Sequence, residues 1–271
     1  MKIRSITYFC NPNYPLNENA LQNAGQFLFE AKSAYEAAGY EVQTTRLATV
    51  PFPQLLGEKK IDELPKFAEK LESAIQQVGI AYASLGPALP EVPRSYVILP
   101  EAIAASQNIF FGGVMADRTR GISLSAIRAC AEVIVKCASI QPNGFANLQF
   151  AALAHVGAGA ACFPAAYHDS DEPAFAIATE SADLAVQAFE NARTLEDGRR
   201  DLISEVTKHG QAISQVAQSL LTNYQFLRFR GIDFSLAPFP DDAHSLGNAV
   251  EKMGIPKIGL HGSLAAAAIL T

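Results

Sequence analysis

Short apolar runs alternate with longer amphipathic stretches along the chain. Residues 3–9 are rich in β-formers and lead into Cys10-Asn11-Pro12, which predicts a strand that ends in a turn. Asn17 offers a cap for an amphipathic helix over 18–38 that Gly39 closes. The same reasoning predicts further strands over 41–47, 80–83, 108–111, 148–154, 174–178 and 226–235, and further helices over 61–78, 97–106, 122–138, 183–191, 199–224, 244–253 and 263–271.

This order of elements indicates the fold class. Strands that alternate with helices of ten or more residues favour crossover units, so we expect an α/β fold with a largely parallel sheet. No linker, composition shift or internal repeat divides the chain, which predicts a single α/β domain over 1–271. The last alanine-rich helix stops after two turns without a cap, so the chain is expected to end before its fold does.

Composition narrows the classes of partner. With 49% apolar and 18% charged residues, the chain has enough apolar side chains for a sizeable core. The net charge is −6 and basic residues cluster in pairs at most, which argues against nucleic-acid binding. The first residues carry no apolar run typical of a secretory signal, and no run of 18 apolar residues occurs. We therefore expect a cytoplasmic protein without a membrane partner.

The four cysteines do not form a recognisable site. No C-x-x-C pair is present, so neither a disulfide framework nor a zinc cluster is predicted. Cys130 and Cys137 are seven residues apart in a helical pattern and are expected to pack as small apolar groups. Unpaired thiols fit a reducing compartment.

Two polar segments are candidate ligand-binding loops, because ligands of parallel α/β folds collect beyond the carboxyl ends of the strands. In the segment 112–123, Arg118 and Arg120 would favour a carboxylate or phosphate near the helix cap Ser123. The alternative is a solvated loop whose arginines pair with surface acids. In the segment 231–238, strand alternation places Asp233 and Ser235 on one face, where they either bind a ligand or hold the following turn.

Two further segments contain histidine. His261 could exchange a proton near neutral pH, and Gly262 and Ser263 would present free amides to an anion at a helix start; alternatively His261 is an ordinary loop residue. His168 lies in an acidic segment, 166–172, and a second acidic histidine segment covers 241–244. No metal is assigned, since H-x-x-x-H and H-E-x-x-H spacings are missing from the sequence. Signatures of P-loop, dinucleotide-binding and serine hydrolase sites are missing as well.

The segments 231–238 (GIDFSLAP) and 259–265 (GLHGSLA) resemble the prokaryotic domain of unknown function 711 family, as do Ile3-Arg4-Ser5-Ile6-Thr7 and Gly121-Ile122-Ser123. The resemblance covers essentially the whole chain. It implies a fold similar to the glycyl radical enzymes of the pyruvate formate-lyase type, an α/β barrel with an internal site, of which this chain is part or all. Family members are generally longer, which implies a missing C-terminal portion. Radical chemistry is not implied, because a glycyl radical loop and a paired-cysteine loop have no counterpart here.

Two functional hypotheses follow. In the first, a non-radical enzyme acts on a small anionic metabolite: Arg118 and Arg120 bind the anion, His261 or His168 moves a proton, and Asp233 orients the imidazole. In the second, a binding or regulatory protein uses the same pocket without chemistry. Both require these side chains to gather in one recess at one rim of the sheet. No cofactor is assigned, and a homo-oligomer or an inactive fragment stays an open alternative.

Overall fold

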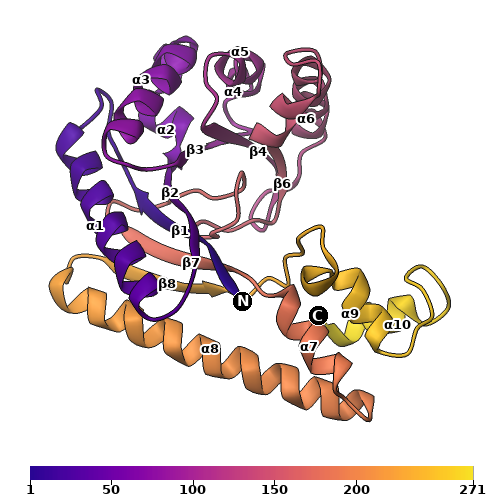
Figure 1. Ribbon diagram of the computed structural model, residues 1–271. Coiled ribbons are helices and arrows are strands. Elements are labelled where there is room, and N and C mark those ends of the chain that lie inside the picture. Colours follow the sequence, from indigo (N-terminus) through magenta and orange to yellow (C-terminus); the bar gives the residue numbers. More distant parts are fainter. Residues whose placement is uncertain (271) are drawn as a thin grey trace.

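A computed structural model describes residues 1–270, built around an eight-stranded sheet (Figure 1). The predicted last helix extends to Thr271, which lies outside the described residues. The strands are β1 (Lys2–Cys10), β2 (Val42–Pro51), β3 (Tyr82–Ala88), β4 (Ile109–Asp117), β5 (Gly121–Ile122), β6 (Phe150–Ala154), β7 (Ala174–Glu180) and β8 (Arg228–Asp233). The α-helices are α1 (Glu18–Ala37), α2 (Phe52–Leu56), α3 (Leu64–Gln77), α4 (Arg94–Val97), α5 (Leu99–Ala104), α6 (Leu124–Cys137), α7 (Ala182–Glu190), α8 (Leu195–Asn223), α9 (Leu246–Lys252) and α10 (Ser263–Leu270). Short 3-10 helices cover Glu58–Glu63, Phe145–Gln149 and Asp242–His244.

The sheet is mixed, so the prediction of a largely parallel sheet was wrong. Its strand order is β5-β4-β3-β2-β1-β7-β8, and β6 pairs with β4. Strands β1, β2, β3, β4 and β6 run parallel, whereas β7 is antiparallel to β1 and carries β8 parallel to itself. The segment between β6 and β7 contains no helix, so β7 starts at the edge where β1 ends, with Ala174 opposite Phe9. Without a crossover, the chain stays at the end of the sheet where the preceding strand stops, so its next strand can run only in the reverse direction.

Helices α1, α3, α5, α6 and α8 cover one face of the sheet (Figure 1). Helix α3 shows how the sequence specifies this packing: Phe67, Leu71 and Ile75 recur every four residues and are almost fully buried. Cys130 and Cys137 of α6 are buried against the same core as free thiols, as predicted. The large apolar side chains of the protein are concentrated on this helical face.

The opposite face is covered by a segment without helix or strand, residues 155–173, which we call the covering loop. Ala48, Ala174, Ala176 and Ala178 of the sheet pack with Phe9 and with Ala161 and Ala166 of the loop. Larger side chains lie on this face as well: the rings of Tyr82 and Phe110 meet edge to face, and Phe110 packs against Phe163 of the loop. The loop connects β6 to β7, which are not neighbours in the sheet, and residues 155–173 contain no helix that would cover this face.

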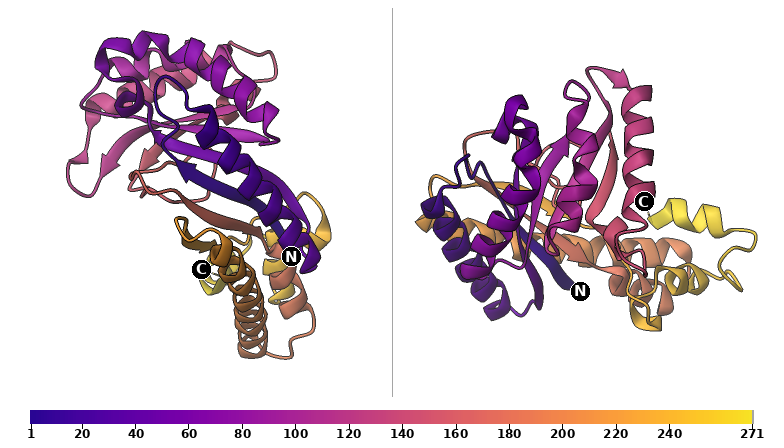
Figure 2. Two further views of the ribbon diagram at one scale, coloured as in Figure 1. Left: turned by 90° about the vertical axis from the view of Figure 1, so that its left-hand side faces the viewer. Right: turned by 90° about the horizontal axis from the view of Figure 1, so that it is seen from above.

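Helices α7, α9 and α10 form a second lobe with the first turns of α8, beside one end of the sheet (Figure 2). Leu184, Phe189, Leu202 and Ala249 make its core. None of the described helices combines the length and the apolar composition needed to cross a membrane.

Strand β4 is longer than the predicted strand over 108–111. Gly112 and Gly113, expected in a loop, lie inside β4. A Cβ atom on Gly113 would lie 2.9 Å from the Cys130 sulfur and 3.1 Å from the Tyr96 ring. The glycine therefore allows α6 to approach the strand closely. Glycine is needed at this position for packing, and not because the backbone turns there. The two-residue strand β5 then folds back on β4 where the sequence predicts the start of a helix.

Candidate functional site

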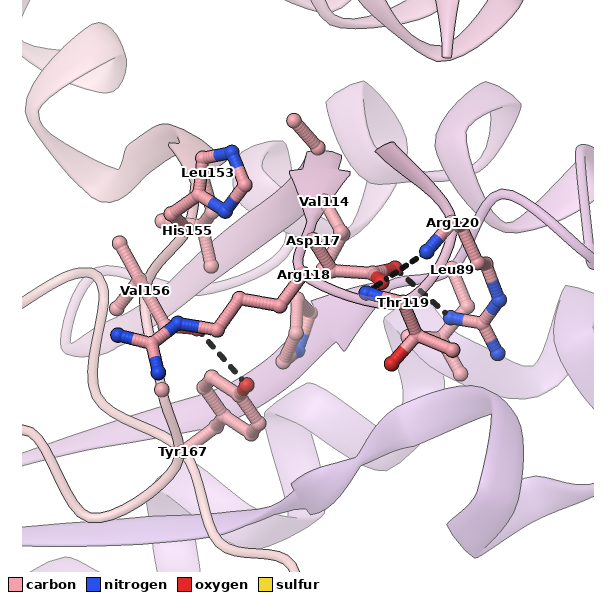
Figure 3. Close-up of a pocket in the computed structure, with 13 residues that line it drawn as sticks. Leu89, Val114, Asp117, Arg118, Thr119, Arg120, Leu153, His155, Val156 and Tyr167 are labelled. Atoms are coloured by element: carbon pink, nitrogen blue, oxygen red, sulfur yellow. Dashed lines mark hydrogen bonds and ion pairs between the residues drawn. The ribbon is translucent and has the colours of Figure 1, made fainter. Parts of the chain in front are cut away.

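A cleft next to the predicted binding loop 112–123 lies where β3, β4 and β6 end. It has a volume of about 600 Å³, and Figure 3 shows the side chains that line it. These strands are parallel, so their carboxyl ends meet at one edge of the sheet. We call it the carboxyl-end cleft. Its polar lining consists of Asp117, Arg118, Thr119, Arg120, His155 and Tyr167.

Asp117 organises the turn from β4 to β5. Its carboxylate accepts hydrogen bonds from the backbone N–H groups of Thr119 (2.8 Å) and Arg120 (2.7 Å) and from the Arg120 guanidinium (3.1 Å). These bonds, with the Arg120 backbone N–H foremost, hold the pKa of Asp117 below its usual value. Asp117 is thus an ionised structural group. Arg120 also pairs with Glu91 at 3.0 Å, so the alternative prediction, pairing with surface acids, is confirmed for this arginine.

Arg118 differs from Arg120 because it has no carboxylate within ion-pair distance among residues 1–270. Figure 3 shows its side chain extending across the cleft toward Val156 and Tyr167 of the covering loop. The guanidinium is exposed. It is therefore a cation that lines the cleft and is available to an incoming anion.

His155 and Tyr167 form the side of the cleft made by the covering loop. His155 directly follows β6, has a positive φ of 57°, and donates its backbone N–H to Ala116 (2.9 Å). The Tyr167 hydroxyl donates to the Val156 carbonyl at 3.0 Å, and burial raises the pKa of Tyr167. Neither residue was predicted as a site residue. The available signal for His155 was its position directly after a predicted strand.

Asp233 and Ser235 lie at the other end of the sheet. Asp233 is opposite Ala178, which is itself opposite Ser5 near the start of β1. Because β8 is antiparallel to β1, its carboxyl end lies beside the amino ends of the parallel strands. Both side chains are exposed, and they line a separate, smaller crevice with Arg4 and Arg46.

His261, Gly262 and Ser263 lie between α9 and α10, in the second lobe. His261 is exposed, and the Ser263 hydroxyl accepts from the Gly259 N–H at 2.9 Å. Arg118, Asp233 and His261 are thus on three separate parts of the molecule. The expected single recess at one rim of the sheet is not formed, and Asp233 does not orient a histidine.

The remaining predicted residues have structural surroundings. Ser123 caps α6, as expected of a helix cap, by accepting from the Ala126 N–H at 3.3 Å. His168 is fully buried beside Phe9, its Nε2 is 3.3 Å from the Ser170 hydroxyl, and its Nδ1 has no partner. Burial lowers the pKa of His168, although Asp169 opposes the shift. This imidazole is closed off from the carboxyl-end cleft.

The acidic histidine segments do not assemble a metal site in the described part of the chain. His244 Nδ1 lies 2.8 Å from the Asp241 carboxylate, which also caps the short helix there. Across residues 1–270, no three His, Cys, Asp or Glu side chains are placed to share an ion.

Comparison with known proteins identifies the family. The sequence model described as "Uncharacterised ACR (DUF711)" matches residues 1–271. The chain belongs to the DUF711 family. This confirms the resemblance seen in the segments 231–238 and 259–265.

Several curated relatives of this DUF711 chain are UPF0210 proteins. That of Acetivibrio thermocellus is 26% identical over 249 residues, which cover 86% of this chain and 54% of the relative. That of Actinobacillus pleuropneumoniae is 25% identical over 272 residues, covering 94% of this chain and 59% of the relative. That of Ruminiclostridium cellulolyticum is 25% identical over 298 residues and covers the whole chain and 65% of the relative. The DUF711 chain therefore spans between 54% and 65% of the length of these relatives.

Proposed function

We propose that the protein binds a small organic anion, a carboxylate or a phosphate monoester, in the carboxyl-end cleft. The observation that carries this proposal is the Arg118 guanidinium, which extends across the cleft and is not neutralised by any carboxylate of residues 1–270. A guanidinium presents a planar fork of N–H donors that matches both carboxylate and phosphate oxygens. Arg120 is already bound to Asp117 and Glu91, so it supports the loop and leaves anion binding to Arg118.

The rest of the lining favours an organic ligand over a bare ion. Leu89, Val114, Leu153 and Val156 give the cleft an apolar part next to the charged one. Its volume of about 600 Å³ lies within the range typical of small-molecule sites, about 300–1,000 Å³. The ligand class that fits is a small molecule with one anionic end at Arg118 and an apolar body.

A second candidate function is an enzyme that acts on the same anion without a radical. It is favoured by His155, because its imidazole lines the cleft and an imidazole is the side chain that most often acts as a general acid or base. In this hypothesis His155 takes the role expected of His261 and His168. The Tyr167 hydroxyl, which stays protonated, would donate a hydrogen bond to a substrate oxygen after leaving Val156.

Calorimetric titration with a panel of small carboxylates and phosphate monoesters tests the binding proposal. We expect Arg118→Gln to weaken binding about tenfold to a hundredfold, since a hydrogen bond to a charged group contributes about 1.5–3 kcal/mol. Arg199→Gln removes the same charge from α8, where Arg199 lies beside Glu196, and is the matched control. If Arg118→Gln binds the panel as the wild type does, the proposal fails.

The enzyme candidate is tested with any anion found to bind. The wild type should convert it, while His155→Gln should bind it normally and convert it at least about a hundredfold more slowly, the usual contribution of general acid–base catalysis. A bound anion that is never converted would leave binding as the function.

At the level of the fold, we also propose that β1 to β4 and β6 belong to an α/β barrel of the glycyl radical enzyme type. Support comes from the distribution of layers: helices cover one face of these parallel strands, and a loop covers the other. The four cysteines are free thiols, which supports a proposed cytoplasmic location.

A further inference from the structure

A second crevice lies on the face of the sheet that carries the covering loop. It is small, about 50 Å³, and is lined by Arg4, Arg46, Cys162, Phe163, Asp233 and Ser235, among others. We call it the arginine crevice. It is separate from the carboxyl-end cleft, with which it shares no lining residue. Two guanidinium groups from the neighbouring strands β1 and β2 meet there.

Arg46 is held in place but not neutralised. Its Nε donates to the Thr44 hydroxyl at 2.9 Å, and its guanidinium carbon lies 4.9 Å from the centre of the Phe163 ring. No carboxylate lies within 4.0 Å of it among residues 1–270. Burial, followed by the charge of Arg4, lowers the pKa of Arg46 to about 10. A partly desolvated cation next to a second cation is costly unless an anion completes the site.

The strand surface beside Arg46 carries buried hydroxyl groups without partners. Thr7 is opposite Arg46 in the β1–β2 pair, and Ser5 is opposite Ala178 in the β1–β7 pair. Both side chains are fully buried, and Ser5 Oγ and Thr7 Oγ1 have no hydrogen-bond partner. Directly opposed residues project from the same face of a sheet, so these hydroxyls lie on the face of the crevice. Neither residue lines the crevice itself, so these hydroxyls add polar character beneath the loop, and the two guanidinium groups are what faces a ligand.

We propose that the arginine crevice binds a small inorganic oxyanion of the phosphate class between Arg4 and Arg46. The crevice has a volume of about 50 Å³, against about 600 Å³ for the carboxyl-end cleft, so it favours a small ion over a ligand with an organic body. Asp233 lies in the same crevice and opposes the anion by its own charge. This site is independent of the proposed function, since it uses other residues at another place.

Cys162 makes the site measurable. Its thiol is exposed and lines the crevice, whereas Cys10, Cys130 and Cys137 are buried. Iodoacetamide is neutral, so its reaction with Cys162 reports on access to the crevice without competing for the arginines. The experiment follows Cys162 alkylation by mass spectrometry at increasing phosphate, with sodium chloride keeping the ionic strength constant.

In the wild type, we expect the alkylation rate to fall several-fold with a saturable dependence on phosphate. Arg46→Gln and Arg4→Gln should each raise the phosphate concentration for half protection about tenfold or more, as expected when one charged hydrogen bond is lost. Arg4 is exposed, so its variant tests the site even if Arg46→Gln fails to fold. Asp233→Asn should lower the half-protection concentration, because it removes a like charge.

Arg118→Gln is the matched control: it should leave protection of Cys162 unchanged while it weakens binding in the carboxyl-end cleft. An alkylation rate that does not change with phosphate, or equal protection in the wild type and in Arg4→Gln, would overturn the proposal. If phosphate does not protect Cys162 but anion binding in the carboxyl-end cleft depends on Arg118, the proposed function stands and this inference fails. If phosphate protects Cys162 but Arg118→Gln leaves anion binding unchanged, only the arginine crevice stands.

Discussion

The side-chain amide of Gln149 holds the two strands that shape the carboxyl-end cleft. Gln149 directly precedes β6 and is 1% exposed. Its Nε2 donates to the carbonyls of Ser106 (3.1 Å), Gln107 (3.3 Å) and Ile109 (2.9 Å), around the start of β4. Gln149→Leu keeps a similar side-chain volume but removes the donors. A buried acceptor without its partner costs about 1–3 kcal/mol, and the amide has two hydrogens. We therefore expect the free energy of unfolding to fall by about 2–6 kcal/mol.

Urea unfolding followed by circular dichroism measures this change. The same substitution at Gln107, whose side chain is exposed, is the control and should change the free energy of unfolding by less than about 0.5 kcal/mol. Gln149→Glu should be at least as damaging as Gln149→Leu, since it places a carboxylate against carbonyl oxygens. Equal midpoints for Gln149→Leu and the wild type would refute the reasoning that these bonds join β4 to β6.

Three further predictions concern other parts of the fold. Burial lowers the pKa of His168, so on acidification the unfolded chain takes up this proton first; stability should fall as the pH drops below about 6.5, and His168→Gln should flatten that slope in urea titrations. An unchanged slope would contradict this. Asn17→Ala removes the acceptor for the Ala20 N–H and should cost about 1 kcal/mol in the same assay, whereas Asn17→Asp should not. Gly113→Ala should cost about 1–3 kcal/mol by overpacking against Cys130, and the double variant with Cys130→Ala should recover part of that loss.

Local features of the fold could be predicted from the sequence, whereas strand direction could not. Asn17 and Ser123 cap their helices as expected, because capping depends on a few neighbouring residues. The direction of β7 depends on the path of the segment before it. The sequence predicts neither a helix nor a strand between residues 154 and 174, and this is the available signal that the chain does not cross back before its next strand. Because no helical crossover precedes β7, this strand pairs antiparallel with β1, and the sheet is mixed.

Strand direction also decides which residues of the candidate site can be predicted from the sequence. The loop with Arg118 follows a strand of the parallel set and lies at the expected edge, so its position could be predicted. Asp233 lies at that edge only in a sheet where β8 runs parallel to β1. In the structure β8 is antiparallel to β1, and this reversal moves the carboxylate to the other end. The pairing of Arg120 with Glu91 depends on residues 29 positions apart and has no local signal.

Helix α8 has 29 residues, which corresponds to a length of about 43 Å at 1.5 Å per residue. Leu202 near its start belongs to the core of the second lobe, and Ile213, Ala217 and Leu220 belong to the core beneath the sheet (Figure 1). One continuous helix thus belongs to both hydrophobic clusters, with Val206 still packed in the second lobe and Ala212 already packed in the core beneath the sheet. Separate unfolding of either cluster therefore requires the helix to break between residues 207 and 211. Amide exchange in that stretch is therefore a gauge of how cooperatively the two halves of the molecule unfold.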